Sequence, residues 1–241
     1  MRLARPVVQP IVRPVVRGIT DAFNGEEKSK SMRLVISTTG ASEIFTLPCQ
    51  NVGVFNALVN WGDGTESSTI TAFNDGDLSH TYLVAGTYTI KISGVFPNIY
   101  FNNGTQRLKL KRIENIGETG LIQLDNGFDG CTNLSYVAGH ADTSLVDTYQ
   151  STFNNCSGLT TFNLSAWNFE SGANFTNFLN GVTLPTEEYD ALLIDLDNQD
   201  IINNLTISFG ASKYTGGGSA AAARANLITN DLLTIIDGGI A

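Results

Sequence analysis

The chain has 241 residues, few charged side chains and a net charge of −9. Its length allows one large or two small domains, and its abundance of Gly, Asn, Ser and Thr is typical of β-rich folds with many turns. Six of its 14 basic and three of its 23 acidic residues lie in residues 1–30, which leaves 8 basic and 20 acidic residues in 31–241. A globular part this acidic excludes nucleic acid as its partner.

The sequence predicts neither a membrane span nor a signal peptide. No apolar run is long enough to cross a bilayer. The first residues have the arginines of a secretory leader, but Pro6, Pro10 and Pro14 interrupt what would be its apolar segment. We therefore expect a protein that is made in the cytoplasm and does not insert into a membrane.

Residues 6–17 repeat a four-residue unit of proline followed by two β-branched residues. The regular prolines exclude a helix and push the residues before them into extended geometry. We expect residues 1–31 to form an extended anchoring arm and linker that docks into a partner. The alternatives are a disordered tail and a segment packed on its own chain. The residues expected to anchor the arm are Arg5, Pro6, Val8, Pro10, Ile11, Arg13, Pro14, Val16 and Arg17.

Residues 32–97 alternate like the strands of a β domain. Strand-like runs end at residue 61, and the Asp63-Gly64 pair that follows predicts a tight hairpin. Three blocks, 61–64 (WGDG), 80–82 (HTY) and 86–90 (GTYTI), resemble the polycystic-kidney-disease (PKD) domain in order and spacing. The resemblance implies an immunoglobulin-like β-sandwich that acts as a spacer or an adhesive module.

Two features of this domain could carry chemistry. No base, acid or nucleophile surrounds His80 in the sequence, and its place in the PKD motif is structural, so we expect a structural histidine. Residues 74–77 (NDGD) could bind calcium through carboxylates. They lack the remaining ligands of an EF-hand loop, so we expect a solvated turn.

Residues 98–241 contain a repeat of 25 residues. Segment 128–134 (FDGCTNL) recurs as 153–159 (FNNCSGL) and, degraded, as 178–184 (FLNGVTL). This period predicts a leucine-rich-repeat solenoid, because each unit can bury its apolar positions only by stacking on its neighbours. Such a fold offers a broad surface rather than a catalytic cleft.

The repeat predicts which side chains face inward. Cys131 and Cys156 hold equivalent places, and we expect them, like Cys49, to be buried thiols; a disulfide between the first two is the alternative. The expected aromatic and aliphatic ladders consist of Phe128, Phe153 and Phe178, and of Leu134, Leu159 and Leu184.

Further resemblances concern the repeat and both ends of the chain. Residues 155–159 (NCSGL) followed by 162–169 (FNLSAWNF) resemble BspA-like leucine-rich repeats, which occur in bacterial surface proteins and in bacteriophage proteins. Segments within 212–239 resemble the C-terminal segments of phage proteins that carry such repeats. Residues 5–20 resemble the start of predicted phage virion proteins.

The C-terminal part departs from the 25-residue period. We expect a helix over 186–196 with Thr186 as its N-cap, a strand over 205–209, a helix opened by Ser219, and a strand over 233–236. This alternation is typical of a cap that hides the last open edge of a solenoid.

Together these patterns predict a mainly β protein: an arm (1–31), a PKD-like, Ig-like sandwich (32–97) and a BspA-like leucine-rich-repeat solenoid with short helices in its C-terminal cap (98–241). The functional hypothesis is a non-enzymatic bacteriophage virion protein of the tail-fibre or capsid-decoration type, without cofactor or metal. It binds other virion proteins through residues 1–30 and assembles in several copies. The alternatives are a bacterial cell-surface adhesin and a glycan hydrolase, which would need two facing carboxylates.

Alternation along the repeat strands places polar side chains on one outward face, while Leu134, Phe162 and Leu164 turn inward. A mixture of aromatic and hydrogen-bonding groups suits recognition of a host-surface glycan or protein. The alternatives are a merely solvated face and one covered by a neighbouring subunit. The face includes Asn133, Ser135 and Thr160, and its candidate ligand residues are Tyr136, Thr161, Asn163 and Ser165.

Overall fold

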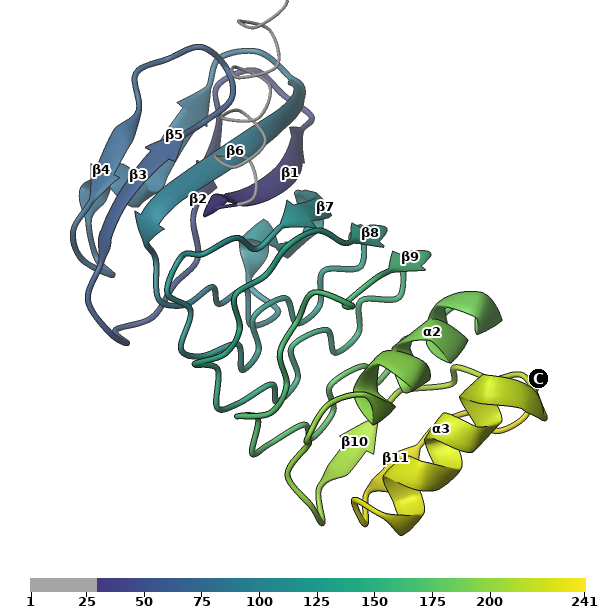
Figure 1. Cartoon of the computed structure of the whole chain (residues 1–241). Helices are drawn as coiled ribbons and strands as arrows, with labels where there is room; N and C mark the ends of the chain where they lie inside the picture. Colours follow the sequence, from purple (N-terminus) through teal and green to yellow (C-terminus); the bar gives the residue numbers. More distant parts are fainter. Residues whose placement is uncertain (1–29) are drawn as a thin grey trace, which may run out of the picture.

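The computed structural model describes residues 30–241, and the expected anchoring residues of the arm lie outside this range (Figure 1). The described chain is mainly β, as predicted. It has one mixed seven-stranded sheet, two sheets of two strands, and two α-helices near the C-terminus. Neither helix has the length and apolar character that spanning a bilayer requires.

The seven-stranded sheet runs through both halves of the described chain. Its order is β4-β3-β6-β1-β7-β8-β9. The strands of its N-terminal half pair antiparallel, while β7, β8 and β9 run parallel to one another. Their bounds are β1 Met32–Thr38, β3 Asn56–Asn60, β4 Ser68–Ile70, β6 Gly86–Val95, β7 Leu110–Asn115, β8 Tyr136–Val137 and β9 Thr161–Phe162.

A second, two-stranded sheet joins β2 (Glu43–Thr46) and β5 (Ser79–Tyr82). The buried side chains of Phe45 and Tyr82 belong to the same hydrophobic core as those of β1 and β6. A 3-10 helix, η1 (Gly76–Leu78), precedes β5, and the carboxylate of Asp75 accepts hydrogen bonds from the N–H groups of Thr71 and Asp77. The segment 74–77 is therefore a hydrogen-bonded turn.

The tight hairpin predicted at Asp63-Gly64 is wrong. β3 and β4 do pair antiparallel, but their last pair joins Val59 to Ser68, so a longer loop connects them. Asp63 folds this loop back, because its carboxylate accepts from the N–H and hydroxyl of Thr65 at 3.1 and 2.6 Å. Gly62 has a φ of 82°, and a Cβ there would lie 2.4 Å from the carbonyl oxygen of Thr89.

Blocks 61–64 and 80–82 of the first domain meet at His80, and Tyr88 of the third block stacks on Tyr82 at 4.2 Å. Its Nε2 lies 2.7 Å from a carboxylate oxygen of Asp63, and its ring stacks on Trp61 at 4.9 Å. Tyr82 packs edge-on against the same ring and donates its hydroxyl to the backbone carbonyl of Trp61 at 2.9 Å. His80 therefore occupies a packed structural cluster, in line with the prediction.

Successive coils of chain stack on each other after β7. Arg112, Tyr136 and Thr161 lie side by side in parallel register, 24 and 25 residues apart. The opposite side of the coils is joined by further parallel bridges, among them Thr148–Asn174 and Phe175–Ile207. Backbone hydrogen bonds also join equivalent positions, as from the N–H of Phe128 to the carbonyl of Thr152 and from that of Phe153 to the carbonyl of Phe178.

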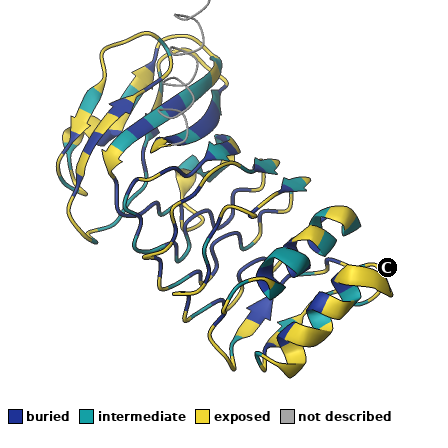
Figure 2. Ribbon diagram, in the orientation of Figure 1, coloured by how far each residue is buried: buried dark blue, intermediate teal, exposed yellow. Residues whose placement is uncertain are grey.

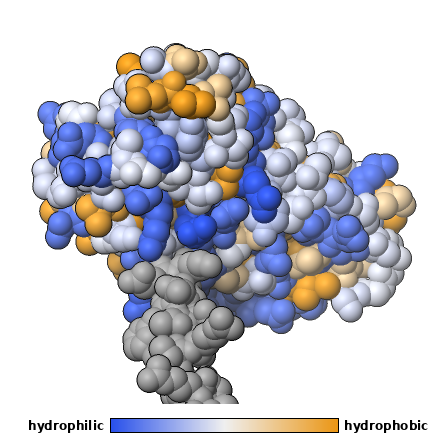
Figure 3. All heavy atoms as spheres, turned by 90° about the horizontal axis from the view of Figure 1, so that it is seen from above, coloured by the Kyte–Doolittle hydropathy of each residue, from blue (hydrophilic) through white to orange (hydrophobic). Residues whose placement is uncertain are grey.

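The interior of the coils holds the predicted ladders (Figure 2). Phe153 lies 5.3 Å from Phe128 and 5.8 Å from Phe178, measured between ring centroids. The leucine ladder is buried as well, and so are Phe162 and Leu164. Apolar residues on the surface seen in Figure 3 occur in small groups separated by hydrophilic ones.

All three cysteines are free thiols, so the alternative of a disulfide between Cys131 and Cys156 is wrong. Cys131 and Cys156 are buried, and Cys156 donates to the carbonyl of Phe128 at 3.1 Å, whereas Cys49, which was also expected to be buried, is only partly so. Burial raises the pKa of both thiols far above the usual range, and raises that of Cys49 to about 11. Thiols that stay protonated are poor nucleophiles.

The C-terminal elements are α2 (Thr186–Asp197), β10 (Thr206–Ser208), α3 (Gly218–Thr229) and β11 (Thr234–Ile236). The order of helices and strands matches the prediction, but the residues expected to be the N-caps of the two helices do not. Pro185 is the N-cap of α2, so Thr186 already lies inside the helix. Gly217, with a φ of 79°, is the N-cap of α3, so Ser219 lies in its first turn. A positive φ favours glycine at that junction.

The small sheet of β10 and β11 has an unpaired edge within the described residues. Within residues 30–241, β11 pairs only with β10. Ile236 and Ile240 near this edge are 51% and 61% exposed.

We expect Phe153→Ala to lower the free energy of unfolding by about 3–5 kcal/mol, because the ring is fully buried between two neighbouring aromatic rings. Denaturant titration measures the change, and Leu145→Ala, at a 64% exposed position, is the control. A loss for Phe153→Ala below about 1 kcal/mol would contradict the assigned core.

We also expect the stabilisation due to Glu43 to disappear at low pH. Backbone N–H groups of Thr39 and Gly40 and the ammonium of Lys109 bind its carboxylate and lower its pKa from 4.5 to about 2. The folded state therefore favours the charged form of Glu43 more than the unfolded state does. The contribution of Glu43 to the free energy of unfolding is complete above pH 4.5 and is lost as the pH falls towards 2. Glu43→Gln should be less stable than the natural chain at neutral pH, with the difference shrinking through that window. A difference that is constant with pH would contradict the assignment.

Candidate functional site

The candidate ligand residues follow the outer side of β8 and β9. Tyr136 and Thr161 are adjacent in register, and Asn163 and Ser165 come directly after β9. Thr161 and Tyr136 are half-buried and the other two are exposed. The structure thus places Tyr136 on β8 and the other three on the neighbouring β9 and the loop that follows it.

Several polar residues of this face are engaged in holding the coils together. Asn133 donates its side-chain amide to the carbonyl of Leu108 at 2.7 Å, and Thr160 donates its hydroxyl to the carbonyl of Ser135 at 3.1 Å. Each of these bonds reaches back one coil, over 25 residues. These side chains satisfy backbone acceptors, so they are less available to a ligand.

Asn163 and Ser165 are also occupied, in this case with each other. The side-chain oxygen of Asn163 accepts from the backbone N–H of Ser165 at 3.0 Å and from its hydroxyl at 2.7 Å. This turn ends the strand and directs the chain towards Trp167. Of the four candidates, Tyr136 and Thr161 therefore have the hydroxyls best placed to bind a ligand.

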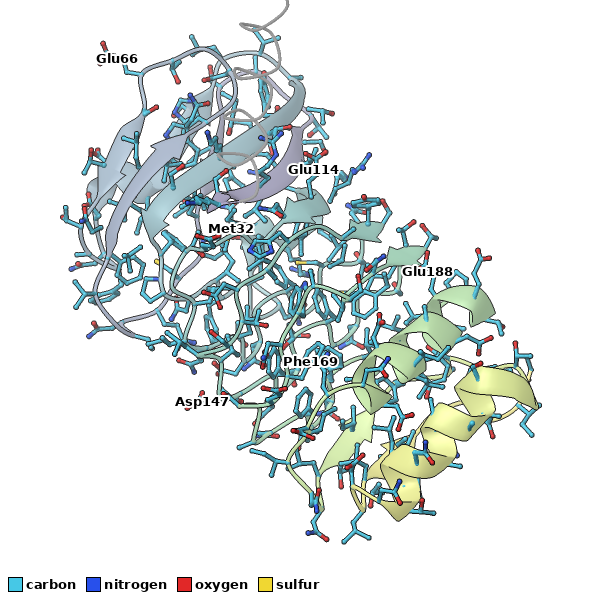
Figure 4. The ribbon with its side chains drawn as sticks, viewed as in Figure 1. Met32, Glu66, Glu114, Asp147, Phe169 and Glu188 are labelled. Atoms are coloured by element: carbon cyan, nitrogen blue, oxygen red, sulfur yellow. The ribbon has the colours of Figure 1, made fainter. Side chains whose placement is uncertain are left out.

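Sequence reasoning missed the charged neighbours of Tyr136. The guanidinium of Arg112 lies over its ring, 4.2 Å from the centroid. Arg112 also lies 4.0 Å from the carboxylate of Glu114 (labelled in Figure 4), which in turn lies 3.4 Å from Arg33. The pairing of β7 with β8 brings Arg112 beside Tyr136, and the pairing of β1 with β7 adds Arg33 to the group.

The free edge of β9 is closed by a side chain of α2. Glu188, labelled in Figure 4, accepts the backbone N–H of Phe162 at 3.2 Å. A carboxylate here replaces the strand that the next repeat would supply. The sheet therefore ends where α2 begins, and a polar pocket lies beyond this junction, between the chain after β9 and the C-terminal end of α2.

No group of three or more His, Cys, Asp or Glu side chains within 30–241 could hold a metal ion. The 74–77 turn, the one calcium candidate of the sequence, uses the carboxylate of Asp75 for its own backbone.

No known protein family, no curated protein and no solved structure is significantly similar to this chain.

Proposed function

We propose that the chain is a non-enzymatic structural protein of a bacteriophage virion, attached to its tail or head. In this proposal residues 1–30 bind other virion proteins and the protein is present in several copies. Residues 32–97 form the PKD-like, Ig-like sandwich, and residues 98–241 form the leucine-rich-repeat solenoid that meets a host surface or a neighbouring subunit. The protein is made in the host cytoplasm and acts in the virion.

The sandwich interpretation is supported by the two sheets that share one core and by the cluster of Trp61, His80 and Tyr82. The solenoid interpretation is supported by coils that stack at intervals of 24 and 25 residues around buried phenylalanines.

One observation carries the functional proposal: the sheet is continuous from β4 to β9. A spacer and a binding surface that share one sheet form a stiff unit, since no flexible linker separates them. Such a unit can hold a ligand face at a fixed distance and angle from its point of attachment. That property suits a fibre or decoration protein better than a protein that must close around a substrate.

The alternative is a bacterial cell-surface adhesin, for which the same stiff unit and the same outward face would serve. The two proposals differ in what residues 1–30 do. An adhesin requires export, whereas a virion protein requires incorporation into a particle.

We expect a variant lacking residues 1–29 to fold but to be absent from purified virions. It keeps Lys30, whose carbonyl accepts the N–H of Glu118, and so keeps the start of β1 in place. Particle purification after expression of the full-length and shortened proteins measures incorporation. Normal incorporation of the shortened, folded variant would show that the arm is not the anchor.

We expect the full-length protein to adhere to host cells and Tyr136→Ala to adhere about tenfold less, because the substitution removes both the hydroxyl and the ring at the centre of the face. Leu145→Ala, at an exposed position elsewhere, is the matched control. Equal adhesion of the Tyr136 variant and the natural chain would exclude this face as the receptor site.

A further inference from the structure

A polar pocket of about 350 Å³ lies between the loop after β9 and the C-terminal half of α2. Its volume falls at the small end of the range of about 300–1,000 Å³ for ligand pockets, which suits a compact ligand. The lining consists almost entirely of residues with hydrogen-bonding side chains: Ser165, Ala166, Trp167, Asn168, Glu170, Asp195, Asn198 and Gln199.

Two groups in this lining have no partner in the described part of the chain. The indole Nε1–H of Trp167, a side chain only 3% exposed, has no hydrogen-bond acceptor. The backbone carbonyl of Asp195 accepts from the side chain of Gln199 at 3.4 Å, but its carboxylate makes no hydrogen bond or ion pair with any described residue, and partial burial raises the pKa of this carboxyl.

Hydrogen bonds fix other residues of the pocket lining in place. Gln199 accepts the backbone N–H of Phe169 at 2.8 Å and donates to the carbonyl of Trp167 at 3.2 Å. Asn168 donates to the carboxylate of Glu170 at 3.3 Å. Phe169, labelled in Figure 4, is buried behind this wall, and its ring lies 6.1 Å from that of Trp167. The pocket therefore has its shape before any ligand arrives, which lowers the entropic cost of binding.

We infer that this pocket binds one ring of an uncharged sugar. Adjacent hydroxyl groups of a sugar both donate and accept hydrogen bonds, so one ligand can donate to the carboxylates of Asp195 and Glu170 and accept from the side-chain amides of Asn168 and Asn198. The two carboxylates exclude phosphate, sulfate and other anions. With no third acidic, histidine or cysteine ligand gathered in residues 30–241, a neutral donor fits them better than a metal ion.

This inference rests on the proposed function, since it gives the host-surface ligand a chemical class and a second contact beside the Tyr136 face. Ser165 belongs to both surfaces, because it ends the turn after β9 and also lines the pocket. A glycan chain that crosses the Tyr136 face can thus place one ring in the pocket.

The test uses the two tryptophans of the chain, Trp61 and Trp167, as internal probes. In the full-length, ¹⁵N-labelled protein each gives one indole N–H resonance, and Trp61→Phe assigns them. Glucose, galactose, N-acetylglucosamine and rhamnose are titrated separately. We expect at least one sugar to shift the Trp167 resonance in a saturable manner while the Trp61 resonance stays unchanged. If none of the four shifts the Trp167 resonance, the inference is wrong.

Two substitutions in α2 test whether the sugar binds at this pocket. Asp195→Asn should weaken sugar binding about tenfold or more, because it removes a charged acceptor of hydroxyl hydrogen bonds. Glu187→Gln changes an exposed acid of the same helix away from the pocket and should bind as the natural chain does. Equal binding by the Asp195 variant would overturn the assignment.

The two proposals can fail separately. Sugar binding by a protein that does not adhere to host cells would leave the pocket assignment intact and contradict the receptor role. Adhesion to host cells without any sugar-induced shift of the Trp167 resonance would leave the receptor role intact and contradict the pocket assignment.

Discussion

The position of β1 between β6 and β7 is the constraint on which the remaining structure depends. β1 is antiparallel to both neighbours, and its residues Leu34 and Ile36 are fully buried. Without this strand the first domain would lose the middle of its sheet, and the stacked coils would lose the strand on which the first of them is built. One seven-residue segment therefore joins two architectures that look independent in the sequence.

Positions that recur every 25 residues mainly serve the stacking of the coils. Asn154, for example, donates to Asp129 at 2.8 Å and accepts from Asn180 at 2.9 Å, so three successive coils are linked by side chains alone. Such bonds satisfy polar groups that the coil geometry would otherwise leave unpaired. Binding groups are more readily found where the repeat stops. The pocket beside α2 arises at such a break, since a helix there replaces the next strand.

The sequence predicts the elements better than it predicts their junctions. The ladder of Phe128, Phe153 and Phe178 follows from the period, because residues that repeat at one spacing must stack in one place. The pairing of Arg33 with Glu114 could not be predicted, because it joins strands 81 residues apart that belong to different sequence patterns. The pocket escaped prediction for a similar reason: Trp167 and Asp195 both line it only because α2 packs on the coils, and the repeat motif that contains Trp167 gives no sign of that packing. The break in the period after residue 184 was the only available signal.

The place of β1 also affects how the chain folds as it is synthesised. β1 precedes every other strand of the described residues in the order of synthesis, yet its partner in β7 follows 81 residues later. At synthesis rates of about 5–20 residues per second, the strand waits roughly 4–16 s for that neighbour. During this time it presents an apolar, β-branched edge to other nascent chains. The order of synthesis therefore leaves the β7-facing edge of β1 unpaired until residues 110–115 have emerged.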